Sequence, residues 1–162
     1  MPAGKKTPTE LEFDFVVVGG GLAGLCAAVA AARHGCTAAI VQDRPVFGGN
    51  SSGEIRVAPL GSASFNAWTR ETGILEELLL EERVRSHDAV YDGMALSHYD
   101  LVLYEAVRAE PGLRMFLNTT VREVETERCP DSKGEGKSFR ITALRASQLG
   151  SEKEFVFKAE HF

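Results

Sequence analysis

Three glycines stand at a spacing that leaves room for a phosphate group beside the backbone. Gly19, Gly21 and Gly24 form a G-x-G-x-x-G pattern directly after the apolar run of residues 16–18. The first glycine permits a tight turn, the second removes a side chain that would hold the backbone away from a pyrophosphate, and the third lets a helix pack closely on a strand. The pattern therefore predicts a turn that binds the phosphates of a dinucleotide.

The elements on either side must hold these glycines at the end of a strand and the start of a helix. Residues 22–33 are almost all helix formers, and Gly35 ends the helix. The backbone N–H groups at its start, at Leu22 and Ala23, would face the phosphates with the positive end of the helix dipole behind them. A second apolar run at residues 37–41 completes a βαβ unit, which makes a glycine turn without a nucleotide the weaker interpretation.

After the βαβ unit, the sequence predicts a long loop, then two helices and then several strands. Residues 44–70 lack periodicity, and because they leave the carboxyl end of the second strand, where open α/β sheets bind ligands, we interpret them as functional. Thr72 is expected to cap a helix over residues 72–85. A capping box of the S-x-x-D kind at residues 97–100 opens a second helix, which Pro111 ends. Strands are expected at residues 113–117, 121–126, 139–147 and 154–158, with a polar turn at residues 130–136.

This order of elements predicts an α/β fold, a Rossmann-like βαβ sheet with an antiparallel β-meander. Residues 1–12 are polar and are expected to form a flexible N-terminal tail before a domain at residues 13–162. The net charge of −5, with no basic cluster beyond Lys5 and Lys6, argues against nucleic acid as a partner. No apolar run approaches the roughly 20 residues that a membrane span needs. Three cysteines without a C-x-x-C pattern predict reduced thiols and a cytoplasmic protein.

Residues 14–24, together with residues 41–50, resemble the N-terminal FAD-binding half of the FAD-dependent oxidoreductases of glutathione-reductase-like fold. The resemblance covers the chain from about Phe13 to its end and implies FAD as the cofactor. The resemblance implies that Gly19, Gly21 and Gly24 contact the FAD pyrophosphate and that Gly48 and Gly49 let their loop pass near it. It also implies that Asn50 and Ser51 lie toward the flavin and that the backbone of Val121 contacts the adenine.

The chain departs from this family at the end of the second strand. Such flavoproteins usually carry Glu there to hold the adenosine ribose, whereas this chain has Gln42 followed by Asp43. Gln42 can bond a ribose hydroxyl, but a neutral amide lacks the charge that strengthens such a bond. Asp43 is an acidic residue of the kind that holds the ribose in dinucleotide-binding βαβ units. The sequence leaves both residues open as the ribose ligand.

No catalytic side chain can be named. The four histidines have no metal-ligand spacing, and Ser51 and Ser52 lack a hydrolase-like arrangement of His and Asp. A bound flavin would carry the redox chemistry while the protein positions a small-molecule substrate. The resemblance thus implies an FAD-dependent oxidoreductase. Two alternatives are an NAD(P)-binding dehydrogenase domain, which would need more βα units after residue 70, and a nonenzymatic flavin-binding module.

The resemblance also implies that the enzyme needs more chain than these residues. In the proteins that it resembles, a Thr-Gly-Asp-like turn after the meander meets the ribityl part of FAD, and no such turn occurs before Phe162. We expect this turn shortly after Phe162, followed by a C-terminal substrate domain. The 162-residue chain by itself is expected to hold FAD weakly and to be inactive.

Overall fold

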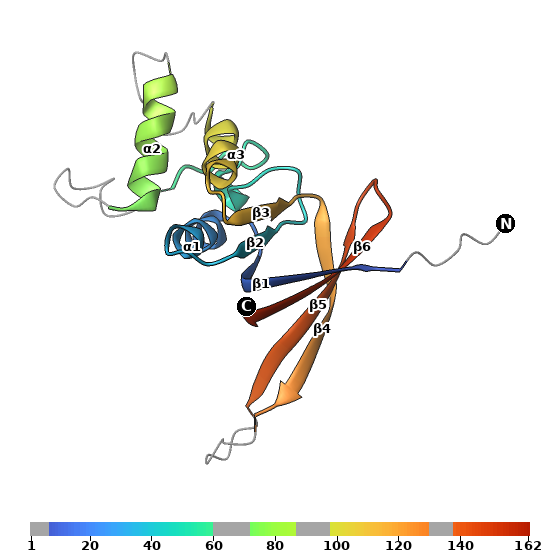
Figure 1. Ribbon diagram of the computed structural model, residues 1–162. Helices are drawn as coiled ribbons and strands as arrows, with labels where there is room; N and C mark the ends of the chain where they lie inside the picture. The colour runs from blue at the N-terminus through green and yellow to red at the C-terminus, as the bar shows by residue number, and fades with distance from the viewer. Residues whose placement is uncertain (1–6, 60–71, 87–97, 130–137) are drawn as a thin grey trace.

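The computed structural model describes residues 7–59, 72–86, 98–129 and 138–162. The elements are β1 (Thr9–Val18), α1 (Leu22–Arg33), β2 (Ala38–Val41), the short 3₁₀ turn η1 (Gly49–Ser51), α2 (Ile74–Arg85), α3 (Tyr99–Ala109), β3 (Leu113–Phe116), β4 (Thr119–Arg128), β5 (Phe139–Gln148) and β6 (Lys153–His161). The described strands form one sheet in the order β3-β2-β1-β6-β5-β4, and the helices lie on one side of its first half (Figure 1).

The first half of the sheet is parallel because βαβ crossovers connect its strands. β1 pairs with β2, and β2 pairs with β3, all in the same direction. All four residues of β2 are buried, as expected for a strand covered on both faces. α1 buries Leu25, Ala28 and Val29 against these strands. α2 contacts α1 and α3 and lies farther from the sheet (Figure 1).

The second half is an antiparallel meander of β4, β5 and β6. β6 also pairs in parallel with β1, so the closing strand of the meander is itself a neighbour of the central strand. The core on this side is aromatic: the Phe157 ring lies 4.9 Å from Phe116 and 5.7 Å from Phe155, measured between ring centroids. The predicted βαβ sheet with a meander is therefore confirmed.

β1 serves both halves because its side chains change faces near Asp14. The N–H groups of Asp14 and Phe15 both donate to the Thr37 carbonyl, at 2.9 and 3.2 Å, as in a β-bulge. Phe13 packs in the aromatic core, whereas Phe15 packs against the helical core. The Asp14 carboxylate accepts the N–H and O–H of Thr37, and these bonds hold its pKa below the usual range.

Three sequence-based expectations need correction. The tail prediction is wrong for residues 9–12, which form the first part of β1. Gly73, with a φ of 78°, takes the N-cap position of α2 in place of Thr72, and no described side chain caps that helix. His98 is the N-cap residue of α3, and the Asp100 carboxylate bonds elsewhere, to Gly53. Parts of the expected tail, loop, capping box and polar turn lie outside the described residues, namely residues 1–6, 60–71, 97 and 130–136.

Candidate cofactor-binding site

The glycine turn leaves the start of α1 open. Gly21 is the N-cap residue, and no described side chain caps the helix there. The first N–H groups of a helix have no partner within the helix, so they can bind an anion. No described atom lies within 4 Å of a Cβ built on Gly21, so the space that a pyrophosphate needs is free. The backbone at this turn fits the phosphates of FAD.

The flanking glycines are required by the backbone itself. Gly19 has a φ of +106°, which L side chains rarely adopt, and its N–H donates to the Val41 carbonyl at 2.8 Å. A Cβ on Gly24 would collide with the Gly19 carbonyl oxygen and lie 3.1 Å from the Val17 side chain. The third glycine therefore allows the close packing of helix on strand that the sequence predicted.

The loop after β2 lies against this glycine turn. The Gly48 N–H donates to the Gly20 carbonyl at 2.8 Å, and Gly48 forms an isolated bridge with Gly21. A Cβ on Gly49 would come within 3.2 Å of the Gly21 Cα. Both Gly48 and Gly49 have a positive φ. The structure thus brings these residues, predicted from two separate motifs, into contact with one another.

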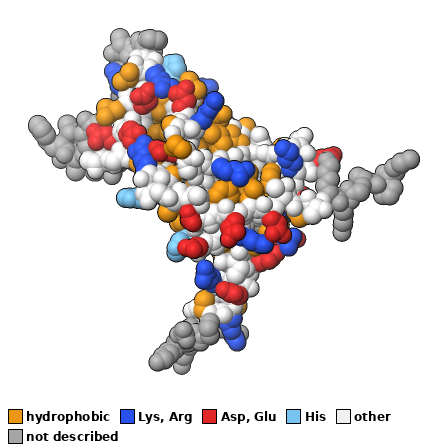
Figure 2. All heavy atoms as spheres, viewed as in Figure 1, with side chains coloured by type: hydrophobic (Ala, Val, Ile, Leu, Met, Phe, Trp, Pro, Cys, Tyr) orange, Lys and Arg blue, Asp and Glu red, His pale blue; other side chains and the backbone are white. Residues whose placement is uncertain are grey.

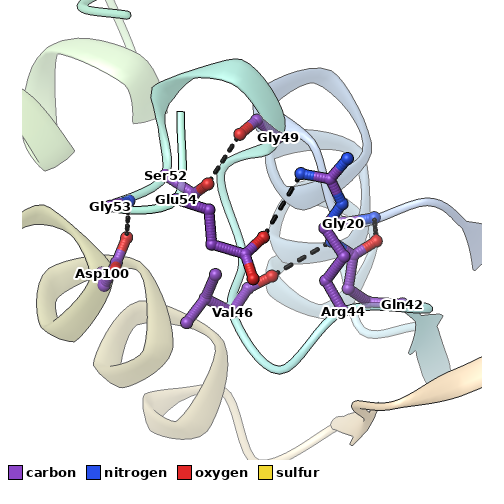
Figure 3. Close-up of polar contacts among 9 residues, drawn as sticks. All are labelled: Gly20, Gln42, Arg44, Val46, Gly49, Ser52, Gly53, Glu54 and Asp100. Atoms are coloured by element: carbon purple, nitrogen blue, oxygen red, sulfur yellow. Dashed lines mark hydrogen bonds and ion pairs between the residues drawn. The ribbon is translucent and has the colours of Figure 1, made fainter. Parts of the chain in front are cut away.

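Asn50 and Ser51 follow within η1 but differ in exposure. The Asn50 side chain is exposed, whereas Ser51 is only 7% exposed. Ser52 is buried, and its hydroxyl donates to the Gly49 carbonyl at 2.8 Å (Figure 3). Of these three side chains, that of Asn50 is the accessible one.

The end of β2 separates the two candidate ribose ligands. Gln42 is only 5% exposed; its Oε1 accepts the Gly20 N–H at 2.8 Å, and its Nε2 donates to the Val46 carbonyl at 3.0 Å (Figure 3). Asp43 is exposed. The Gln42 amide therefore ties the glycine turn to the following loop, while the Asp43 carboxylate faces solvent.

Val121 is held near this strand end by the backbone that precedes it. The Thr119 N–H donates to the Gln42 carbonyl at 2.8 Å, and the Asn118 N–H donates to the Arg44 carbonyl at 3.1 Å. Val121 itself is half-buried against the aromatic core, two residues into β4 beyond Thr119.

Two further contacts hold the loop and were missed from the sequence. Asp100 accepts the Gly53 N–H at 2.6 Å, and Arg44 pairs with Glu54 at 3.3 Å (Figure 3). The only sequence signal was the acidic residue in the first turn of α3, which was interpreted as part of a capping box. Among the described residues, no group of three or more His, Cys, Asp or Glu could hold a metal.

Comparison with known proteins decides the family. A family model described as FAD dependent oxidoreductase matches residues 14–162. The chain belongs to this family. Its cofactor is FAD, so the family and cofactor predictions are confirmed. No protein with a curated description matches the chain significantly.

Solved structures of longer proteins share the fold at low identity. Thermovibrio ammonificans THI4 is 21% identical with a TM-score of 0.57, over 92% of this chain and 55% of that protein. Adenylylsulfate reductase from Archaeoglobus fulgidus is 16% identical with a TM-score of 0.57, over 96% of this chain and 30% of that protein. Sdh1 from Mycobacterium smegmatis is 15% identical with a TM-score of 0.56, over 93% of this chain and 33% of that protein. This FAD dependent oxidoreductase chain therefore spans 30% to 55% of the length of these proteins.

Proposed function

We propose that this chain is the FAD-binding part of an oxidoreductase that exchanges electrons with a small-molecule substrate. The observation that carries the proposal is the uncapped start of α1, which is open at Gly21 and lies directly beside the loop of Gly48 and Gly49. When bound, the isoalloxazine of FAD supplies the acceptor for electrons or hydride. The residues of this chain bind and orient the cofactor.

The proposed contacts begin at the pyrophosphate in the middle of FAD and then extend to its two ends, the flavin and the adenine. The pyrophosphate meets the backbone of Gly19, Gly21, Leu22, Ala23 and Gly24, the loop of Gly48 and Gly49 passes beside it, Asn50 and the backbone of Ser51 lie toward the flavin, and the backbone of Val121 contacts the adenine. The free space over Gly21 and the exposed side chain of Asn50 support this order.

We assign the adenosine ribose to Asp43 in preference to Gln42. Each polar atom of the Gln42 amide already bonds the backbone, and the side chain is buried. Asp43 is exposed at the same strand end and can form the charge-assisted bond that the fingerprint requires. Gln42 then serves to fix the glycine turn on which the pyrophosphate rests.

The whole protein is proposed to act in the cytoplasm on a small molecule held by a C-terminal substrate domain. The three cysteines are free thiols in the structure, which supports a reducing compartment. The greater length of the similar solved structures supports a further domain. Among the described residues, no helix is long and apolar enough to cross a membrane.

The test is to release the cofactor from the purified whole protein and to identify it by chromatography. We expect FAD at about one molecule per chain, and recovery of nicotinamide nucleotide alone would contradict the proposal. Anaerobic mixing with candidate electron donors then separates an enzyme from the alternative, a flavin-binding module without catalysis. Rapid reduction of the flavin by one donor supports an enzyme, and a flavin that no donor reduces supports the module.

A further inference from the structure

The loop that carries Asn50 and Ser51 is tied to the helical layer by one side chain from α3. The Asp100 carboxylate accepts the Gly53 N–H at 2.6 Å, across 47 positions of the sequence (Figure 3). A hydrogen bond from a backbone N–H to a carboxylate is charge-assisted and stronger than one between neutral groups. Asp100 therefore adds a charge-assisted bond from α3 to a loop whose other end is bonded to the turn after β1.

Asp100 is available for this contact because it does not cap its own helix. The N-cap residue of α3 is His98, and no described side chain makes a capping bond there. Asp100 lies in the first turn, where the helix dipole stabilises a negative charge. Its carboxylate thus lies where it can accept the Gly53 N–H.

The opposite anchor of the loop is the glycine turn. The Gly48 N–H donates to the Gly20 carbonyl. Between the two anchors the loop folds on itself, because the Ser51 N–H donates to the Gly48 carbonyl and the Ser52 N–H donates to the Gly49 carbonyl. A turn held at both ends fixes the place of the Asn50 backbone.

Glu54, the residue after Gly53, forms an ion pair that is weaker than the bond from Gly53 to Asp100. Arg44 and Glu54 lie 3.3 Å apart, and both side chains are more than a third exposed. Exposed ion pairs of this kind contribute little to stability. The Gly53 carbonyl accepts a bond from Arg56 Nε at 3.1 Å, only three positions away, so the bond to Asp100 is the contact that joins Gly53 to α3.

We infer that Asp100 is a positioning residue for the cofactor: by holding Gly53, it keeps the turn of Asn50 and Ser51 against the pyrophosphate-binding glycines. This role rests on the proposed FAD contacts of that turn. Without Asp100, the loop keeps its anchor at Gly48, which lies against Leu103 of α3, but loses the hydrogen bond at Gly53. FAD then dissociates faster, and the surroundings of the flavin become less ordered.

Gly53 provides a matched way to break the same contact. Its φ is outside the positive range, so alanine fits the backbone there. A Cβ on Gly53 would nevertheless collide with Oδ2 of Asp100. Gly53→Ala should therefore disturb the loop in the presence of Asp100 and be harmless in its absence.

The experiment uses the purified whole protein with bound FAD. The FAD dissociation rate is followed by the fluorescence of released flavin, and the visible circular dichroism of the bound flavin is recorded. Asp100→Ala and Gly53→Ala are each expected to raise the dissociation rate about tenfold. The double variant should resemble Asp100→Ala alone, because the collision is gone. Asp100→Asn keeps an acceptor without the charge and should fall between Asp100→Ala and wild type.

The control variant is Glu105→Ala, which removes a carboxylate from the same helix. Glu105 pairs with Arg85 of α2. Its removal should change the rate less than about twofold. An equal effect of Glu105→Ala and Asp100→Ala, or wild-type rates and dichroism in both Asp100→Ala and Gly53→Ala, would overturn the role of Asp100. A wild-type protein that holds no FAD would instead overturn the proposed contacts of the loop.

Discussion

The two halves of the sheet bury different kinds of side chain. In the parallel half, β2 contributes Ala38 and Ile40 to the core beneath the helices and Ala39 and Val41 to the aromatic core, and the site beside it is made of glycine backbone. In the meander half, Phe155 and Phe157 of β6 form an aromatic core with Phe13 and Phe116 of the parallel half, and β4 is exposed over most of its length. Figure 2 shows acidic and basic side chains interspersed over the meander strands. Small residues give a nucleotide access to the backbone, whereas large rings give the meander its stability.

Besides the pairing of β1 with β6, the halves meet at the end of β2, where the meander supports the site without lining the glycine turn. The backbone bonds from Asn118 and Thr119 to Arg44 and Gln42 make this connection. The comparison therefore predicts that substitutions in the aromatic core lower stability, and that substitutions at the glycine turn lower FAD binding.

The largest expected effect is on the stability of the meander. Phe157 is fully buried against Phe116, Phe155 and Phe13, so Phe157→Ala should lower the free energy of unfolding by about 3 to 5 kcal/mol. Urea denaturation measures this change. The FAD affinity of the variant that remains folded should stay within about threefold of wild type. A large loss of affinity in folded Phe157→Ala would remove the proposed division between the halves.

The second effect is the converse, a loss of binding without a loss of fold. Gly21→Val places a side chain in the free space over the turn, so FAD retention should fall at least about 100-fold, or about 2.7 kcal/mol. The far-ultraviolet circular dichroism should change little, because the added atoms meet no described neighbour at Cβ. Full FAD occupancy in this variant would show that the phosphates bind elsewhere.

The third effect distinguishes the two residues at the end of β2. Asp43→Ala should weaken FAD binding by about 1 to 3 kcal/mol, because a charged acceptor for the ribose is lost. Gln42→Ala should lower the free energy of unfolding, because the Gly20 N–H and the Val46 carbonyl lose their partner. Titration with FAD and urea denaturation of both variants check the assignment. Unchanged affinity in Asp43→Ala would exclude it as the ribose ligand.

The smallest effect concerns the helical layer and depends on pH. Arg33 of α1 bonds Glu77 of α2 in a bidentate pair and Glu110 after α3 (distances of 2.7 Å), and it holds the pKa of Glu77 below its usual range. Since the pKa is lower in the folded state, this stabilisation is present above the unfolded pKa and is lost as the pH falls through the folded value. Glu77 is half exposed, so Glu77→Gln should cost less than about 1 kcal/mol at pH 7.

Urea denaturation at neutral pH and at about pH 3, below the usual pKa of a glutamate, checks this sign. The difference between wild type and Glu77→Gln should shrink at the lower pH. A difference that stays constant would show that the ion pair does not account for it.

The parts of the fold that could be predicted are those with a strong local pattern. The valines of β1, the glycine turn and α1 determine one another over a short stretch, so the βαβ unit and the family followed from the sequence. The start of β1 was missed because Glu10 and Glu12 looked like a solvated tail. Leu11 and Phe13 alternate with them, and this is the period of a strand with one buried face.

The remaining features depend on tertiary contacts that no local pattern specifies. The orientation of Gln42 is set by the Gly20 N–H and the Val46 carbonyl, and a polar residue at that position could equally have faced a ligand. Asp100 fitted a local capping box, yet its partner lies 47 positions away. Gly73 occupies the cap position that Thr72 was expected to take, because the chain enters α2 with a positive φ.

The double pairing of β6 has a consequence for the order of folding. β4 and β5 are neighbours along the chain, so they can associate early as a hairpin. β1 can pair with β2 as soon as α1 has formed, but Thr9 must wait for Phe155 before the first part of β1 gains a partner. During synthesis, the edge of β1 therefore stays unpaired until β6 has left the ribosome, and an open strand edge is a site at which a nascent chain can aggregate.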